Sequence, residues 1–170
     1  MKYKNAGFLL GLSLILPCLV QAADVTITVD GSVIARPCQS LPGDKTVNFG
    51  DVYNTSLNTA GSSTAWIDIP LELRQCPVGT STVKVTFNGP VATNPAYYAN
   101  SSNPGSAGGI ELELQDDLGS ILKDGVSRDI PVNFTNGTAS LTVKARVRSE
   151  SGMTTEGSIN AVINVTYTYL

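Results

Sequence analysis

Period-two alternation of apolar and polar residues is the feature that most constrains the fold of this chain. Alternation places apolar side chains on one face of an extended strand and polar ones on the other. The alternating runs are also rich in Thr, Val and Ile, which favour strands. Their apolar positions fall within Val25 to Val33, Ile67 to Leu73, Val83 to Phe87, Ile110 to Leu114, Leu141 to Val147 and Ile159 to Tyr169. Helical periodicity is scarce, so the chain is predicted to be all-β.

Clusters of turn-forming residues separate these runs. They lie at 88–90, 101–109, 117–119, 124–125 and 136–137. Asn136-Gly137 falls between Val132–Phe134 and Ala139–Val147, which predicts a β-hairpin. Seven or so short strands at such spacing predict one antiparallel two-sheet sandwich of the immunoglobulin type, with a small barrel as the alternative.

The first 22 residues have the layout of an export signal. Lys2 and Lys4 precede an apolar stretch from Phe8 to Val20, and Val20-Gln21-Ala22 offers small residues for cleavage. A membrane anchor is the alternative, but the stretch is shorter than the ~20 residues that span a bilayer. We therefore expect a signal peptide at 1–22 and a mature chain at 23–170.

Charge and cysteine usage narrow the class further. The whole chain has a net charge of −3, and loss of Lys2 and Lys4 makes the mature part more acidic, so a nucleic-acid partner is not expected. Cleavage also removes Cys18 and leaves Cys38 and Cys76. Two cysteines in an exported chain predict one disulfide, and two free thiols are the alternative.

Residues suited to catalysis are few. The chain has no histidine, which excludes Ser-His-Asp and Cys-His sites and the usual zinc ligand sets. The acidic pair Asp116-Asp117, and Glu111 with Glu113 on one strand face, are the only carboxylate candidates for a glycosidase. Such acids at a strand end more often lie in a solvated turn. No cofactor or metal motif is present, so we expect no enzyme, no cofactor and no metal site.

Aromatic residues leave one other binding function open. Trp66, Tyr97 and Tyr98 are candidates for a sugar-stacking surface, which makes a secreted carbohydrate-binding module the rival hypothesis from another class. A lone Trp in a sandwich is more often part of the core, and a Tyr pair beside Pro and Asn more often packs within a loop.

The two ends of the mature chain carry the strongest signal. Residues 24–36 alternate up to Pro37 and Cys38, and when extended they span roughly 43 Å, enough to cross a sandwich lengthwise. An ordinary first edge strand is the alternative. Residues 158–170 alternate to the last residue, after Gly157. An apolar strand of this kind at a sheet edge leaves an open hydrogen-bonding ladder that another strand can extend.

In this combination the chain resembles pilins of the chaperone–usher family. The shared features are an N-terminal extension at 23–36, cysteines at Cys38 and Cys76, a glycine fourteenth from the C-terminus (Gly157) and a penultimate tyrosine (Tyr169). Within the family it is similar to a minor subunit from the tip of type 1 fimbriae. That closer resemblance rests on ADVTITV at 23–29, LEL..CPVGTS at 71–81, YY.N at 97–100, IELELQDD.G at 110–119 and AVI.VTYTY at 161–169.

The resemblance implies a fold and a set of residue roles. The expected fold is an incomplete immunoglobulin-like sandwich at 37–170, a pilin fold that lacks its last strand and is completed by donor-strand complementation. The extension at 23–36 would be the donor strand, with Val25, Ile27, Val29, Gly31 and Val33 facing a neighbour's groove. The residues expected to line this chain's own groove, or to face a chaperone there, are Gly157, Ile159, Ile163, Val165, Tyr167, Tyr169 and Leu170.

The resemblance also implies partners and a location. The expected partners are the tip adhesin, the next tip subunit, a periplasmic chaperone and an outer-membrane usher, with no small-molecule substrate. The protein would pass through the periplasm to a cell-surface fimbrium of a Gram-negative bacterium and contribute to adhesion through the fibre. A major rod pilin or another tip subunit is the alternative within the family.

Overall fold

The computed structural model describes residues 30, 32, 37–41 and 43–170, and all structural statements concern these residues. The elements in chain order are β1 (Gln39–Leu41), the short 3-10 helix η1 (Asn54–Leu57), β2 (Ile67–Arg74), β3 (Thr82–Asn88), β4 (Tyr98–Ala99), β5 (Glu111–Asp116), β6 (Ser127–Pro131), β7 (Ala139–Arg148) and β8 (Asn164–Tyr169). Among the described residues, no helix is long and apolar enough to span a membrane.

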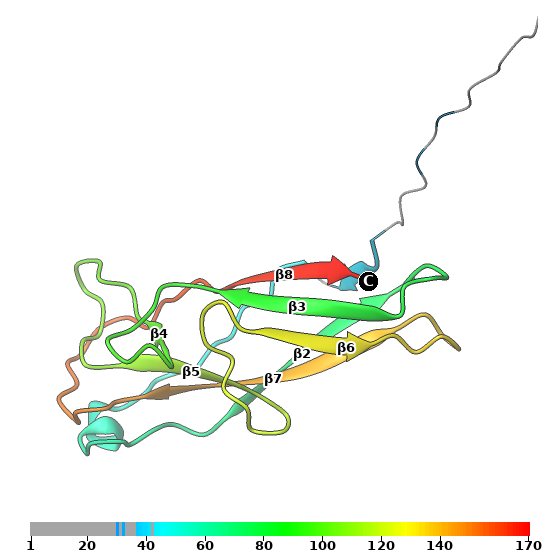
Figure 1. Cartoon of the computed structure of the whole chain (residues 1–170). Helices are drawn as coiled ribbons and strands as arrows, with labels where there is room; N and C mark the ends of the chain where they lie inside the picture. Colours follow the sequence, from blue (N-terminus) through cyan, green and yellow to red (C-terminus); the bar gives the residue numbers. More distant parts are fainter. Residues whose placement is uncertain (1–29, 31, 33–36, 42) are drawn as a thin grey trace, which may run out of the picture. The chain divides into compact units, whose positions relative to one another are not determined.

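The strands form two antiparallel sheets. A five-stranded sheet has the order β1-β2-β7-β5-β4, and a three-stranded sheet has the order β6-β3-β8. The sheets face each other as the two layers of a sandwich, and the longest ladder joins β2 to β7 (Figure 1). This confirms the predicted all-β, immunoglobulin-like sandwich.

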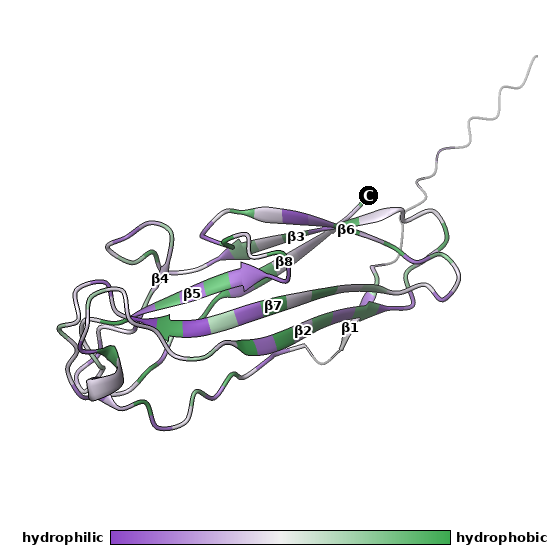
Figure 2. Ribbon diagram, turned by 90° about the horizontal axis from the view of Figure 1, so that it is seen from below, coloured by the Kyte–Doolittle hydropathy of each residue, from purple (hydrophilic) through white to green (hydrophobic). Residues whose placement is uncertain are grey.

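The core lies between the two sheets and follows the predicted alternation. Along β3, Val83, Val85 and Phe87 are buried, and on the facing sheet Leu73, Leu112, Val143 and Ala145 are buried with them. Figure 2 shows the resulting alternation of hydrophobic and hydrophilic positions along β2, β5 and β7. A smaller apolar cluster of Leu57, Ile110 and Val147 fills one end of the sandwich.

The predicted hairpin at Asn136-Gly137 is wrong. The chain segment there leaves β6, which pairs with β3, and begins β7, which pairs with β2 and β5 in the other sheet. Only one isolated bridge, between Asn133 and Thr138, joins the two sides of the turn. The turn therefore crosses between layers, and Phe134, predicted as part of a strand, is exposed within it.

The C-terminal alternation is also longer than the strand that it forms. Regular pairing begins at Asn164, opposite Asn88, although the apolar pattern starts at Ile159. Strand β3 ends at Asn88 and is followed by Gly89 and Pro90, so the segment before Asn164 has no partner strand in this sheet. Ile159, Ala161 and Ile163 are still half-buried against the core.

Candidate functional site

The outer edge of β8 is an unpaired sheet edge within the part of the chain that the structure describes. Strand β8 pairs only with β3, and the two backbone hydrogen bonds between Leu170 and Thr82 fix which residues of the ladder face each other. In an antiparallel ladder, alternate residues turn their N–H and C=O toward the partner strand. Thr166 and Thr168 therefore face β3, while Val165 and Tyr167 turn these groups outward.

The core is only partly covered along this edge. The core-facing residues of the C-terminal segment are all half-buried, whereas the core-facing residues of the neighbouring strand β3 are buried. They are Ala161, Ile163, Val165, Tyr167 and Tyr169. From elsewhere in the fold, Phe49, Ile69 and Leu141 are half-buried against the same core. We call the open strip beside β8 the β8 groove. It combines free backbone hydrogen-bonding groups with incompletely covered apolar side chains.

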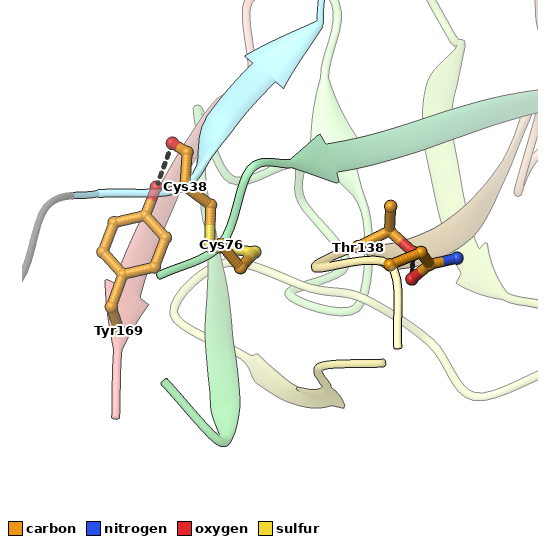
Figure 3. Close-up of a disulfide and its surroundings, with 5 residues drawn as sticks. Cys38, Cys76, Thr138 and Tyr169 are labelled. Carbon is orange, nitrogen blue, oxygen red and sulfur yellow. Dashed lines mark hydrogen bonds between the residues drawn. A yellow bond between two sulfur atoms is a disulfide. The ribbon is translucent and has the colours of Figure 1, made fainter. Parts of the chain in front are cut away.

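A disulfide lies at one end of the β8 groove. Cys38 and Cys76 are bonded over a sequence separation of 38 residues, as predicted. Closing a loop of this length restricts the unfolded chain by about 4 kcal/mol in the chain-entropy model. The hydroxyl of Tyr169 donates a hydrogen bond of 3.3 Å to the carbonyl oxygen of Cys38 (Figure 3). The end of β8 is thereby tied to the residue directly before β1.

The two groove tyrosines are weaker acids than a solvated tyrosine. Desolvation raises the pKa of Tyr167, and the nearby Tyr169 raises it further. Desolvation also raises the pKa of Tyr169. Because even the ordinary pKa of tyrosine, 10.0, lies above the physiological range, both residues present an apolar ring with a neutral hydroxyl, which suits a surface that receives apolar side chains.

The other end of the groove holds a pocket of about 570 Å³. Its apolar lining includes Phe49, Leu57, Ile110 and Ile159. Gly157 lies at its rim with φ 151°, and a Cβ there would meet the backbone of Ser106 and Ala107 more closely than real Cβ atoms approach. The close approach of these two backbone segments allows the N–H of Ala107 to donate a hydrogen bond of 3.0 Å to the carbonyl of Ser158. Only glycine fits this position.

The predicted donor residues cannot be placed. Val25, Ile27, Val29, Gly31 and Val33 lie outside the described residues. By contrast, the structure brings together the C-terminal residues predicted for the groove, Ile163, Val165, Tyr167 and Tyr169, on its core-facing side. Leu170 is exposed and pairs with Thr82, and Gly157 with Ile159 belongs to the pocket.

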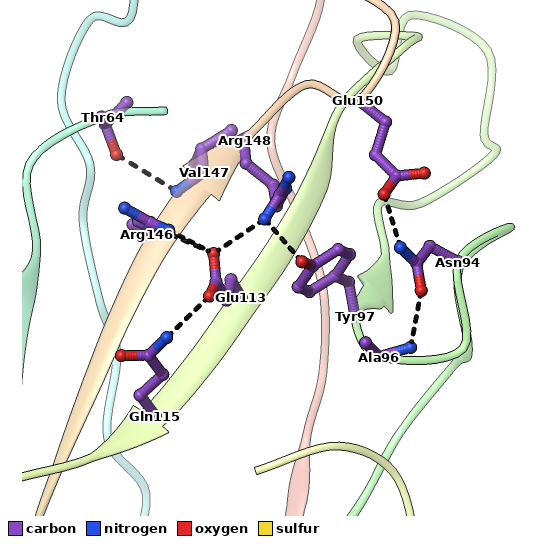
Figure 4. A network of polar contacts seen from close by, with 10 residues as sticks. All are labelled: Thr64, Asn94, Ala96, Tyr97, Glu113, Gln115, Arg146, Val147, Arg148 and Glu150. Atoms are coloured by element: carbon purple, nitrogen blue, oxygen red, sulfur yellow. Dashed lines mark hydrogen bonds and ion pairs between the residues drawn. The ribbon is translucent and has the colours of Figure 1, made fainter. Parts of the chain in front are cut away.

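Glu113 is the centre of a polar network that the sequence did not reveal (Figure 4). Its side chain is 3% exposed and lies 2.8 Å from Arg146 and 3.3 Å from Arg148. Gln115 donates a further hydrogen bond of 2.8 Å to the same carboxylate. The pairing of Glu113 with Arg146 across β5 and β7 explains how a carboxylate is tolerated in a buried position. Its role is structural.

The aromatic residues of the rival hypothesis are largely occupied by this network. The guanidinium of Arg146 lies 4.2 Å from the ring centre of Trp66, and that of Arg148 lies 4.2 Å from that of Tyr97. Tyr98 is buried in the core, which corrects its assignment to loop packing. Trp66 and Tyr97 are both half-buried, and each has a cation against one face of its ring.

Of the carboxylates considered for catalysis, Asp117 is exposed in a turn, as predicted, whereas Glu111, Glu113 and Asp116 are buried, contrary to the prediction. Asp116 forms an ion pair of 2.8 Å with Arg128. Burial raises the pKa of Asp116, but the hydrogen bonds from Arg128 and from the N–H groups of Ser120 and Leu118 outweigh it, so the pKa is lowered overall. Asp116 therefore closes a turn as an ionised acceptor. Among the described residues, no three Asp, Glu or Cys side chains gather as metal ligands.

Comparisons with known proteins agree with this architecture. The model of the family described as "Fimbrial protein" matches residues 27–169. The chain is 44% identical over 170 residues to protein FimG of Escherichia coli K12, covering 99% of each chain. It is 41% identical over 150 residues to the fimbrial-like protein YdeR of the same strain, covering 88% of this chain and 87% of that one.

A solved structure supports the fold independently. The crystal structure of the P pilus rod subunit PapA superposes with a TM-score of 0.65 at 23% identity, over 79% of this chain and 100% of that one. At this identity the likeness concerns the fold alone. Together with the family model, which covers most of the chain, and the two relatives, it leads to one conclusion. The chain belongs to the fimbrial protein family, and it is a fimbrial subunit.

Proposed function

We propose that this chain is a minor subunit of type 1-like fimbriae that links the tip adhesin to the next subunit by donor-strand exchange. The likeness to FimG over nearly the whole chain supports the tip position. The unpaired edge of β8 supports this mechanism, because an added strand can form backbone hydrogen bonds along it. A major rod subunit is the alternative within the family.

The mechanism uses both ends of the mature chain. Residues 23–36 enter the groove of the subunit ahead, where Val25, Ile27, Val29 and Val33 bury their side chains and Gly31 crosses a shallow point. Burial of four Val and Ile side chains contributes about 6–12 kcal/mol before the cost of ordering the arm. The β8 groove receives the corresponding arm of the subunit behind.

The groove also explains why assembly needs helpers. A half-covered core and free strand edge aggregate unless they are covered during export. A periplasmic chaperone fills the β8 groove first, and at the outer-membrane usher the arm of the incoming subunit replaces the chaperone. The family places the finished subunit in an extracellular fimbrium of a Gram-negative bacterium, among other pilus subunits.

Deletion of residues 23–36 tests this function. The shortened subunit still forms a complex with its chaperone, because the β8 groove is intact, but it does not join the subunit ahead. The control is the double variant Thr26→Asp/Thr28→Asp, whose changes fall on the opposite face of the extended arm and leave assembly intact. Normal incorporation of the deletion variant into purified fibres would refute the proposal.

The number of copies in a fibre separates the two family alternatives. Mass spectrometry of purified fibres measures the ratio of this chain to the rod protein. A minor linking subunit is present far below the rod protein, whereas a ratio near one identifies a rod subunit.

A further inference from the structure

The end of the sandwich that holds the disulfide exposes three apolar side chains. The exposed fractions are 106% for Val78, 73% for Phe134 and 55% for Leu170. Val78 lies in the turn between β2 and β3, Phe134 lies in the turn between β6 and β7, and Leu170 follows β8 (Figure 1). We call this set the disulfide-end surface.

Hydrogen bonds join these segments into one surface. The N–H of Cys76 donates to the carbonyl of Gly137 over 2.9 Å, which holds the two turns together. The N–H of Ser81 donates to the carbonyl of Leu170 over 2.7 Å, which attaches the end of β8. In both ribbon views these turns lie at the same end of the sandwich (Figures 1 and 2).

The disulfide-end surface has the composition of an interface core. Residues 75–82 and 131–140 contain no Asp, Glu, Lys or Arg, although 15% of the chain is charged. Depletion of charge around exposed apolar side chains distinguishes the centres of protein interfaces from ordinary surface. This points to a protein partner.

The two turns hold their apolar residues away from the core. In the first, the N–H of Thr80 donates to the carbonyl of Pro77 over 3.2 Å. In the second, Asn133 exchanges backbone bonds with Thr138, and its side chain accepts from the N–H of Thr135 over 3.0 Å. Because these turns are already ordered, the segments that carry Val78 and Phe134 lose little conformational entropy on binding.

We propose that the disulfide-end surface packs against the subunit that receives this chain's arm, as a second contact beside the donated strand. The inference rests on the proposed function. Val33 is the last arm residue expected in the groove, and the chain from Val33 to Cys38 spans at most about 17 Å. The receiving subunit must therefore lie close to this end of the sandwich.

The direction of the arm specifies which end of the receiving subunit is met. The missing strand of an immunoglobulin sandwich lies antiparallel to the last strand of the three-stranded sheet. The end of the arm nearest Cys38 then lies where the receiver's last strand begins. Contacts between opposite ends of successive subunits are head-to-tail contacts, and these build open fibres.

The end of this chain opposite the disulfide corresponds to the end of the receiving subunit that the disulfide-end surface would contact. Tyr53 and Met153 are exposed there, beside the pocket at the start of the C-terminal segment. The hydroxyl of Thr154 donates to the carbonyl of Asn54 over 3.3 Å, which holds the two loops together. A related receiver with apolar residues at these positions would match Val78 and Phe134.

Photo-cross-linking in assembled fibres tests the contact. The photo-reactive p-benzoyl-phenylalanine replaces Phe134 in the full chain, and the control carries it at Leu118, an exposed apolar position in the turn after β5. After irradiation of purified fibres, position 134 gives an adduct to the start of the receiver's last strand, and position 118 gives none. Fibres that contain the chain but yield no adduct from position 134, or equal adducts from both, overturn the inference. Absence of the chain from fibres instead refutes the proposed function.

A second measurement does not depend on the cross-linker. Electron cryo-microscopy of fibre tips gives the spread of angles between this subunit and the one ahead. The double variant Val78→Ser/Phe134→Ser broadens that spread relative to Leu118→Ser, because the donated strand alone then holds the two subunits. Equal spreads in the two variants overturn the inference.

Discussion

The hydroxyl of Tyr169 donates a hydrogen bond of 3.3 Å to the carbonyl oxygen of Cys38 (Figure 3). Tyr169 belongs to the three-stranded sheet, and Cys38 directly precedes β1 of the five-stranded sheet. This one bond therefore joins the two layers at the open side of the sandwich.

Tyr169→Phe should lower the free energy of unfolding by about 1 kcal/mol, the net value of one such hydrogen bond. Tyr167→Phe is the matched control, because Tyr167 lies on the same face of β8 and its hydroxyl makes no hydrogen bond to the described residues. Denaturant unfolding of the purified subunit measures both. Equal effects of the two changes would show that the bond to Cys38 contributes nothing.

Gly157→Ala should destabilise the subunit by about 2 kcal/mol or more, because the added Cβ meets the backbone of Ser106 and Ala107 and neither can yield cheaply. Gly61→Ala is the control: its φ of 80° is also left-handed, but nothing lies near the new Cβ. Thermal unfolding of both variants separates the steric clash from the backbone strain. If Gly61→Ala is equally damaging, the close approach at Gly157 is unimportant.

Glu111→Gln should stabilise the subunit at pH 7. Burial raises the pKa of Glu111 above its ordinary value of 4.5, an effect that the backbone N–H of Asn94 and the Arg148 charge oppose and that Glu150 reinforces. The folded state therefore binds the proton more tightly than the unfolded state, so the ionised form is penalised at neutral pH. The penalty disappears as pH falls through the folded pKa toward 4.5.

Asp116→Asn should change the free energy of unfolding in the opposite direction in the same experiment. Because the pKa of Asp116 is lowered from 3.8, its ionised form stabilises the fold above that pH and the contribution is lost below it. Unfolding free energies at pH 7 and pH 4 should show a gain for Glu111→Gln that shrinks at pH 4, and a loss for Asp116→Asn at pH 7. A pH-independent gain for Glu111→Gln would contradict the assignment.

Gly31→Leu should obstruct donor-strand exchange while leaving chaperone binding unchanged, because the side chain would meet the shallow point of the receiving groove. Ser32→Leu is the control, since the neighbouring residue of an extended strand faces the other way. The rate at which each chaperone-bound variant joins the subunit ahead is the measurement. Equal rates would refute the proposed register of the arm.

The sequence predicted the strands that turn one face to the core and the other toward solvent. Ile67 to Leu73, Val83 to Phe87 and Leu141 to Val147 correspond to β2, β3 and β7, because such strands alternate apolar and polar residues. The short strands β1 and β4 were not predicted, since three and two residues are too few to show a period. The turn at Asn136-Gly137 was recognised, but sequence does not say whether a turn joins two strands of one sheet or two layers.

The site was only partly predictable. The alternation from Ile159 to Tyr169 matches a set of side chains that are half-buried against the core, although pairing starts only at Asn164 because β3 ends opposite it. The burial of Glu113 could not be foreseen, since its partner Arg146 is far along the chain and becomes its neighbour only when β5 pairs with β7. Alternation shows on which face of a strand a side chain lies, but it does not show which residue of the neighbouring strand lies beside it.

Hydrogen exchange at the backbone amides of Val165, Tyr167 and Tyr169 tests the central claim most directly. These residues turn their N–H groups toward the open side of β8, and an added strand would supply the missing acceptors. In purified fibres their exchange should be as slow as that of Val83 and Val85 in β3. Exchange in fibres as fast as that of exposed turn amides would show that no strand completes the sheet.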